Sequence, residues 1–448
     1  MVIKISQLAL KRPFVSKMFR NPYIVFAPVC VLFILYALFT TPFNELISGL
    51  FAIITGPDIL VTDYIYIGGL GAAFLNVGIT GLLTIAILVA VKQDITGPVI
   101  AILWLAVGFA FFGKNPANMT PIILGGVLWA LFSGKKIKEV INPVLMGTTL
   151  APAVSQAARI PDIGVWGFLT IALLVGIMIG FFITPVSVFL RKIQEGYNLY
   201  PVGFAAGIMA LFIMGFYRNL GWGFEVLSLW SSGYNNLLIV LLSGISVYFI
   251  VMGVIAKTRS EHSFKELLHM KAEDKLDFWT PYRECAYFSM GVNGLLLSVL
   301  VVLVGGDLTG PTIGGIFTVV GFCAFGKRLL DIWPVLVGAT AAAFLRHLAM
   351  VLENNHGFEL LSFAPINDNV IIVTLLFATC LAPVTRDFGW KWGMIAGFLH
   401  LSLATSAAHL HGGMNLYNNG FTGGLVAMVL LPIIRAARCR KNCKQEQL

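Results

Sequence analysis

Long apolar segments alternate with short polar ones along the whole chain, and this pattern predicts a bundle of membrane-spanning helices. As helices, most of the apolar segments would cross most of a hydrocarbon layer of about 30 Å. The predicted fold class is therefore an all-α polytopic membrane protein of about 14 spans, seven in each half of the chain. The segments are 23–41, 65–91, 97–112, 119–134, 143–157, 165–190 and 201–217, and then 236–256, 284–304, 309–325, 332–350, 360–382, 391–410 and 419–436.

Four stretches fit a straight span poorly. Segments 97–112 and 309–325 are short of a ~30 Å layer at about 1.5 Å per residue. Residues 143–157 and 359–369 are polar and interrupted by proline. Irregular backbone at membrane depth is tolerated only where it is buried in protein or lines an aqueous cavity. These stretches therefore predict re-entrant or discontinuous helices.

The two halves of the sequence are copies of each other. Asp94-Ile-Thr-Gly-Pro98 matches Asp307-Leu-Thr-Gly-Pro311 at a shift of 213 residues, and Gly113-Lys114 matches Gly326-Lys327 at the same shift. Over residues 76–125 this shift gives 19 identities in 50 positions. Apolar bias does not align Asp, Thr, Pro and Lys, so the match indicates a tandem duplication.

A second matched block places Asn198-Leu-Tyr200 on Asn415-Leu-Tyr417, at a shift of 217 residues. Seven spans per copy is an odd number, so the second copy would enter the membrane from the opposite face, as a 7+7 inverted repeat. Charge supports the inversion, because Lys135-Lys136-Ile137-Lys138 matches a loop without Lys or Arg, Glu353–His356. Loop 257–283 is rich in charge, whereas its partner 41–64 has no Lys or Arg.

The positive-inside rule also predicts the orientation. With a cytoplasmic N-terminus, all but four of the 30 Lys and Arg residues lie on the cytoplasmic side, the exceptions being Lys114, Arg159, Arg218 and Arg346. We expect a plasma (cytoplasmic) membrane protein with both termini cytoplasmic. The expected parts are a basic N-terminus (1–19), a first repeat (20–217), an extracytoplasmic linker (218–233), an inverted second repeat (234–436) and a basic tail (437–448).

Composition agrees with a lipid environment and narrows the function. Apolar residues make up 58% of the chain and charged residues 11%, with a mean hydropathy of +0.87. So few charges could not cover the surface of a soluble protein of this size. The net charge of +9 lies in short loops and tails rather than in a basic stripe with aromatics, so nucleic acid is not an expected partner. The apolar segment 220–234 is a candidate surface for packing against another protomer.

The matched charged residues suggest gates. Under the expected topology Asp94 and Lys327 lie at the cytoplasmic face, and Asp307 and Lys114 at the outer face. Two symmetric ion pairs, Asp94–Lys327 and Asp307–Lys114, would then act as alternate gates. The alternative is structural: Asp-x-Thr-Gly-Pro suits a helix start, in which Asp or a threonine (Thr96, Thr309) caps exposed N–H groups, and Gly-Lys suits a helix stop with a snorkelling lysine.

The loops before the last helix of each copy are the candidate substrate or ion pathway. A loop rich in amides, aromatics and glycine that enters a helix can bind polar solutes or ions through its backbone and helix N-terminus, although such loops also form ordinary turns. The second loop adds histidines that could titrate near neutral pH. The candidate residues are Asn198, Tyr200, Asn415, Tyr417, Asn418, Asn419, His409 and His411.

No catalytic constellation is present in the sequence. It has no Walker loop and no His-Glu-x-x-His motif, and its polar residues are spread over both copies rather than gathered in one pocket. We therefore expect no enzyme activity, no cofactor and no metal site.

Two motifs carry a resemblance to known proteins. Gly108-Phe-Ala-Phe-Phe-Gly113-Lys114 with Pro121, and His411-Gly-Gly-Met-Asn-Leu-Tyr-Asn-Asn-Gly-Phe421, are similar to an uncharacterised family of prokaryotic multipass membrane proteins. The likeness covers nearly the whole chain and implies no substrate. Thr41-Pro-Phe-Asn44 faintly resembles a motif of urea channels, which are also inverted repeats, but this chain has no second copy of it.

The leading hypothesis is a transporter that moves a small polar or ionic solute by alternating access between inverted repeats, with H⁺ or Na⁺ as a candidate coupling ion. Inverted repeats with broken helices are typical of such proteins, and their substrates bind where the repeats meet. One alternative is a channel for a small neutral solute or ion. Another is an intramembrane enzyme or assembly factor that uses the region 409–419.

Overall fold

The computed structural model describes residues 21–56, 58, 61–160, 164–223, 228–257, 276–356 and 365–445. The first part of the chain contains α3 (Tyr23–Thr40), α4 (Phe43–Thr55), β1 (Val61–Thr62), α5 (Tyr64–Ala90), α6 (Gly97–Phe109), α7 (Pro116–Phe132), α8 (Ile137–Gly147), η1 (Thr148–Leu150), α9 (Ala151–Ser155), η2 (Gln156–Arg159), α10 (Gly164–Gln194) and α11 (Pro201–Asn219).

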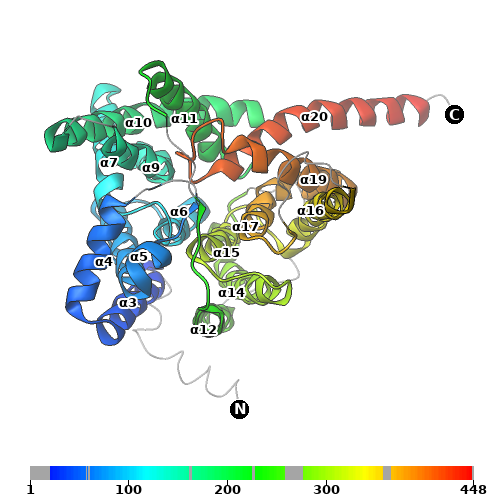
Figure 1. Cartoon of the computed structure of the whole chain (residues 1–448). Helices are drawn as coiled ribbons and strands as arrows, with labels where there is room; N and C mark the ends of the chain where they lie inside the picture. The colour runs from blue at the N-terminus through cyan, green and yellow to red at the C-terminus, as the bar shows by residue number, and fades with distance from the viewer. Residues whose placement is uncertain are drawn as a thin grey trace, which may run out of the picture.

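The second part begins with β2 (Ser228–Leu229) and is otherwise helical. Its helices are α12 (Asn235–Lys257), α14 (Trp279–Leu303), α15 (Gly310–Phe322), α16 (Leu329–His356), α17 (Asn369–Ala378), η3 (Thr379–Leu381), α18 (Ala382–Phe388), α19 (Trp390–Ala407) and α20 (Asn418–Gln445). Figure 1 shows the earlier helices on one side of the molecule and the later ones on the other.

The protein is an all-helical, multipass membrane protein. Ten helices in the described part of the chain are long and apolar enough to cross a membrane, and four shorter apolar helices accompany them. Large apolar side chains on the outside of the bundle, such as Phe39, Trp166 and Phe212, are exposed to the surroundings. Such a surface suits lipid and would be unfavourable in water.

Each expected apolar segment contains a helix, but several differ from a straight span. α6 and α15 have only 13 residues each. Segment 143–157 is broken into α8, η1 and α9, and segment 360–382 contains the break between α17 and α18. Residues 359–364 of the expected 359–369 interruption lie outside the described residues.

One expectation needs correction, because 41–64 is not simply a loop. It contains α4, which packs against the start of α5. A Cβ on Gly49 would lie 2.2 Å from the carbonyl oxygen of Gly68, so the two backbones touch at this point. Gly49 and Gly68 permit that approach because neither has a side chain.

Helix pairs recur in the two halves of the chain. α3 packs on α5 as α12 packs on α14, and α7 packs on α10 as α16 packs on α19. Between the halves, α6 packs on α15 and α11 packs on α20. The duplicated sequence is therefore matched by duplicated helix pairing.

α6 and α15 form the centre of the molecule. Every residue of α15 and nearly every residue of α6 is buried, as expected of helices that are apolar on all sides. At 13 residues each is about 20 Å long, and protein surrounds both. A Cβ on Gly108 would lie 3.0 Å from the carbonyl oxygen of Gly314, so a small residue is required at this crossing.

Two aspartates tie the halves together at the starts of these central helices. The Asp63 carboxylate accepts a hydrogen bond from the Gly310 N–H of α15 (3.1 Å), and the Asp277 carboxylate accepts one from the Gly97 N–H of α6 (2.9 Å). Each aspartate thus satisfies an exposed first-turn N–H of a helix in the other half of the chain. This pair of contacts explains why Asp-x-Thr-Gly-Pro is followed by a helix in both halves.

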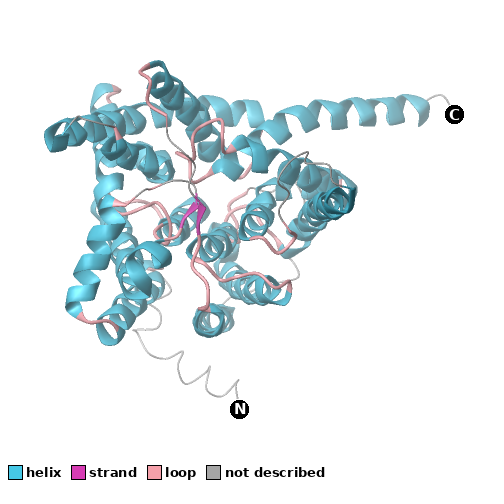
Figure 2. Ribbon diagram, in the orientation of Figure 1, coloured by secondary structure: helices cyan, strands magenta, loops and turns pink. Residues whose placement is uncertain are grey.

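The linker between the halves also uses Asp63. Its β2 pairs in parallel with β1, which Figure 2 shows at the centre of the view. Ser231 donates to the Asp63 carboxylate through both its backbone N–H (3.0 Å) and its hydroxyl (2.5 Å). The described parts of segment 220–234, proposed above as a protomer contact, therefore pack partly against their own chain.

We predict that Asp63→Ala destabilises the protein strongly. The carboxylate accepts four hydrogen bonds, from Ile65, Gly310 and both donors of Ser231, and the substitution leaves these donors without an acceptor. The expected loss is about 3 kcal/mol or more in the free energy of unfolding, measured by thermal or detergent-induced unfolding of the purified protein. The control is Asp94→Ala, whose exposed carboxylate pairs with Lys138 and whose loss should cost less than about 1 kcal/mol. Equal losses would contradict the assignment.

Candidate functional site

The two Asn-Leu-Tyr loops meet at the interface between the halves, and each loop contacts the opposite half in the same way. In each loop the asparagine Oδ1 accepts from the backbone N–H two residues later, at 2.9 Å for Asn198 and 3.0 Å for Asn415. The asparagine Nδ2 then donates to a carbonyl of the opposite copy, Asn198 to Gly420 (3.0 Å) and Asn415 to Gly203 (3.2 Å). The amides therefore shape each loop and fasten it to the other half.

Each loop also donates a backbone hydrogen bond to a broken helix of the opposite copy. The N–H of Leu199 donates to the carbonyl of Cys380 (3.0 Å) in η3, and the N–H of Leu416 donates to the carbonyl of Thr149 (3.1 Å) in η1. The breaks arise at Thr148-Thr-Leu-Ala-Pro152 and Thr379-Cys-Leu-Ala-Pro383, because proline removes an N–H and its ring crowds the preceding turn. The backbone groups freed by the breaks are thus satisfied within the protein.

Tyr200 and Tyr417 stack on each other where the loops meet. Their ring centroids are 4.4 Å apart, and the rings of Phe322 and Phe377 pack around them. Both tyrosines are buried. The stack brings the two loops into contact and fills the centre of the interface with aromatic rings, referred to below as the aromatic barrier.

The two lysines of the Gly-Lys motifs lie beside this barrier. Lys327 donates through Nζ to the hydroxyl of Tyr200 and to the Thr379 hydroxyl (2.7 Å). Lys114 lies over the ring of Phe109, with Nζ 5.4 Å from the centroid, and Phe109 packs on Tyr417. Each lysine is only 1% exposed, so neither snorkels to a surface.

The expected ion-pair gates are not formed in this structure. Asp94 is 77% exposed and pairs with Lys138 (2.7 Å) rather than with Lys327. Asp307 accepts from the side-chain amide of Asn235 (3.1 Å) rather than from Lys114. The reason is that Asp94 and Asp307 precede their helices at the edge of the bundle, whereas both lysines turn into its centre.

The two threonines of the matched motif both precede a central helix, but only one of them caps it. Thr309 caps α15 reciprocally with Thr312, and Thr96 occupies the corresponding position before α6 without a side-chain cap. For Thr309 the structure therefore favours the capping interpretation over the gate interpretation.

Two cavities open beside the loops and are lined by matched positions of the two copies. The first, of about 450 Å³, is bounded by α8, α10, Pro98 and the loop at Asn198, and the second, of about 260 Å³, by α17, α19, Pro311 and the loop at Leu416. Matched lining positions are Pro98 and Pro311, Phe325 and Phe112, Leu199 and Leu416, Asn142 and Val373, Met146 and Phe377, and Val188 and Thr405.

Charge distinguishes the two cavities. Lys135, Glu139 and Arg191 line the first one, whereas no Asp, Glu, Lys or Arg is among the described residues that line the second. The first is therefore net positive and the second is neutral apart from His409.

The histidine-rich loop contributes to the second cavity and to its support. His409, Asn418 and Asn419 line it. His411 contacts the Asn418 Oδ1 through Nε2 at 2.9 Å and is fully buried. His411 therefore positions Asn418, and the described residues contain no cluster of three His, Cys, Asp or Glu suited to a metal ion.

A buried polar cluster that the sequence did not suggest surrounds Asp58, just before α5. Its carboxylate accepts from the hydroxyl of Tyr64 (2.7 Å), the hydroxyl of Ser155 (2.6 Å) and the amide of Asn118 (3.0 Å). Burial raises the pKa of Asp58 to about 6, although these hydrogen bonds lower it in part. The cluster ties the loop before α5 to α7 and α9.

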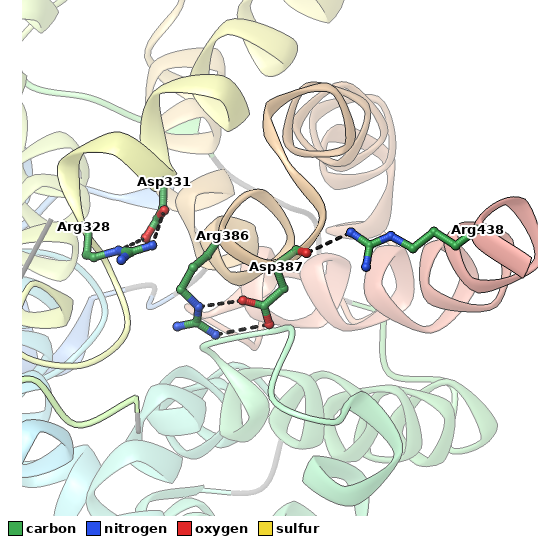
Figure 3. Close-up of polar contacts among 5 residues, drawn as sticks. All are labelled: Arg328, Asp331, Arg386, Asp387 and Arg438. Carbon is green, nitrogen blue, oxygen red and sulfur yellow. Dashed lines mark hydrogen bonds and ion pairs between the residues drawn. The ribbon is translucent and has the colours of Figure 1, made fainter. Parts of the chain in front are cut away.

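The equivalent positions of the second half carry charge pairs (Figure 3). Arg328 and Asp331, which match Asn115 and Asn118, form a bidentate pair at 2.6 and 2.9 Å. Arg386 bonds Asp387 at 2.8 Å, and Arg438 of α20 donates to the Asp387 carbonyl at 2.9 Å. The Arg328–Asp331 pair thus replaces the Asn115–Asn118 amide pair at the start of a helix, and Arg438 joins α20 to α18.

The sequence reasoning missed the threonines at the helix breaks. Thr148 and Thr379 each donate to a carbonyl three residues earlier, at 2.7 Å, and Thr379 also contacts Lys327. The recurrence of Thr-x-Leu-Ala-Pro at both sites was the available signal. It was hidden because its shift of 231 residues differs from those of the other two matched blocks.

Comparisons with known proteins give one match. The model of the family described as "Protein of unknown function (DUF1576)" matches residues 43–219 and 256–436. Neither the curated proteins nor the solved structures include a significant match to the chain.

We predict that Asn198→Ala and Asn415→Ala destabilise the protein by similar amounts. Each substitution removes a bond from the loop backbone and a bond to the opposite copy, at buried positions; Asn198 also loses two longer bonds, to the Gln194 side chain (3.3 Å) and the Tyr200 carbonyl (3.4 Å). The expected loss is about 1–3 kcal/mol each, read from unfolding of the purified variants. Asn367→Ala is the control, because its exposed amide makes one long bond to Gly305 (3.4 Å) and should cost little. If only one of the two variants lost stability, the two loops would not be equivalent.

We predict a pH dependence that Asp58→Asn removes. The folded protein holds the Asp58 proton more tightly than the unfolded chain, because its pKa is raised from 3.8 to about 6. This contribution to stability is full below about pH 4 and is lost as the pH rises through about 6. Unfolding midpoints of wild type and Asp58→Asn, compared from pH 4 to 8, should therefore diverge as the pH rises. Parallel curves would contradict the assignment.

Proposed function

This chain belongs to the DUF1576 family, and we propose that it is a membrane transporter that moves a small polar or ionic solute by alternating access. The observation that carries the proposal is the pair of cavities lined by matched residues on either side of the Tyr200–Tyr417 stack. The first cavity, of about 450 Å³, is in the size range of pockets that hold a small molecule, about 300–1,000 Å³, and the second, of about 260 Å³, lies just below that range.

The cavities have the arrangement expected of an inverted repeat. If the second copy is inverted relative to the first, two cavities at matched positions open to opposite faces of the membrane. The charge of the first cavity agrees with a cytoplasmic opening, because Lys135 lies in the loop before α8 and Arg191 in the last turn of α10, and the positive-inside rule favours such charges on the cytoplasmic side. The proposed arrangement is thus a 7+7 inverted repeat in the plasma membrane, with both termini cytoplasmic.

The broken helices provide the moving parts. Discontinuous helices at a repeat interface are typical of secondary transporters, since their breaks place backbone groups and small hinges at the substrate. In this chain Leu416 and Leu199 each donate one backbone bond to η1 and η3, and Lys327 adds a side-chain bond to η3. Exchange of the two halves between equivalent positions would open one cavity while the other closes, with the tyrosine stack as the shared barrier. A coupling ion, H⁺ or Na⁺, and a homo-oligomer remain part of this hypothesis.

A channel for a small solute is the alternative. A channel would need a continuous path, whereas both tyrosines are buried and stacked in this conformation. The stacked tyrosines therefore support a transporter over an open pore, and an intramembrane enzyme or assembly factor is the third hypothesis.

The proposal is tested by thiol accessibility at matched cavity positions. Asn142→Cys lines the first cavity and Val373→Cys the second, and each is introduced singly into a background without Cys439 and Cys443. A membrane-impermeant thiol reagent is applied to right-side-out and to inverted vesicles. We expect Asn142→Cys to react only from the cytoplasmic side and Val373→Cys only from the opposite side.

Other labelling patterns have distinct meanings. Labelling of both positions from the same side would contradict the inverted arrangement. Labelling of each position from both sides in every condition would indicate a continuous channel. The background protein without either added cysteine, whose remaining cysteines are buried, controls for non-specific reaction.

A further inference from the structure

Two buried ammonium groups lie at the centre of the interface without carboxylate partners. Lys114 and Lys327 are each 1% exposed. Among the residues that the structure describes, neither forms an ion pair with Asp or Glu. An isolated buried charge is costly, and buried charges are normally paired. A buried lysine is relieved either by loss of its proton or by a counter-charge, and an anion from outside the chain would supply the second.

The groups around Lys327 are donors more than acceptors. Its ammonium has three donors, two of which meet the hydroxyls of Tyr200 and Thr379. The Thr379 hydroxyl already donates to the Leu376 carbonyl (2.7 Å). The buried hydroxyl of Tyr417, on the ring stacked against Tyr200, has no hydrogen-bond partner among the described residues. This surplus of donors suits a ligand that accepts hydrogen bonds and carries negative charge.

Each lysine belongs to a loop that borders one cavity. Phe325, two residues before Lys327, lines the first cavity, and Leu199 of that cavity packs on Gly326. Phe112, two residues before Lys114, lines the second cavity, and Leu416 of that cavity packs on Gly113. Lys135 and Arg191 add positive charge to the first cavity, against one carboxylate, Glu139. The ammonium groups themselves lie behind these lining residues, each 1% exposed.

We propose that the transported solute is a small anion, a carboxylate or an inorganic oxyanion, which binds between Lys327, Tyr200 and the Tyr417 hydroxyl. This inference depends on the proposed function and names its substrate class. Lys114 would hold the anion in the opposite conformation, in which it contacts Tyr417 as Lys327 contacts Tyr200 here.

The test measures anion binding before transport. Purified wild-type protein is unfolded thermally in sodium acetate, phosphate, sulfate, nitrate or chloride, with sodium gluconate as reference and with sodium and ionic strength held constant. We expect at least one small anion to raise the midpoint in a concentration-dependent way, because a ligand of the folded state stabilises it. Acetate against phosphate and sulfate separates a carboxylate site from an oxyanion site.

Variants tie the effect to the site. Lys327→Met should weaken binding of that anion at least tenfold, whereas Lys327→Arg, which keeps the charge, should retain part of it. Lys138→Met is the matched control, because Lys138 is a surface residue paired with Asp94, and it should bind as wild type does. Size-exclusion chromatography of each variant confirms that it is folded.

The outcomes separate the two proposals. If no anion distinguishes wild type from Lys327→Met, the anion site is refuted. Uptake into proteoliposomes is then measured with labelled anions and with labelled neutral and cationic solutes. Anion stabilisation without uptake would refute the transporter and leave the anion site standing. Uptake of a neutral or cationic solute alone would leave the transporter standing and refute the anion.

Discussion

The structure depends on one constraint of the bilayer, that every backbone N–H and C=O must find a partner inside the protein. This chain breaks a helix in each half, at Thr148-Thr149-Leu150 and at Thr379-Cys380-Leu381, and so creates carbonyls that no helix satisfies. Leu199 and Leu416 donate to those carbonyls from the opposite copy. Neither half can satisfy its own break, so the two halves depend on each other.

The same reciprocity recurs at the central helices. α6 and α15 expose first-turn N–H groups at their starts, and Asp277 and Asp63 of the opposite half accept from them. Because these contacts cross the interface in both directions, the short central helices are held without reaching the surface of the bundle. They support the loops that bound the two cavities.

Matched positions with different residues show where the two halves have diverged. Asn115 and Asn118 stand where Arg328 and Asp331 stand in the other half, and both sets form buried networks at the start of a helix. A neutral amide network and a bidentate ion pair serve the same structural purpose. Arg328 precedes α16 and Arg438 lies near the end of α20. Under the proposed topology both of these helix ends are cytoplasmic, where positive charge is favoured.

The amino-acid sequence by itself determined the membrane class, the positions of the apolar helices other than α4, the duplication and the two Asn-Leu-Tyr loops. These follow from hydropathy and from identities between polar residues, which are local properties of the chain. The family match and the helices of the structure confirm the resemblance and the membrane class.

The tertiary structure decided which polar side chains pair with each other. The sequence suggested that Asp94 would pair with Lys327, because opposite charges were expected at the same face. In the fold Asp94 stays at the edge beside Lys138, while Lys327 reaches Tyr200 and Thr379. Asp63 and Asp58 carried no pattern that marked them, since their importance comes from donors far away in the chain. Which polar groups meet inside a bilayer depends on how helices pack, and a one-dimensional pattern does not contain that information.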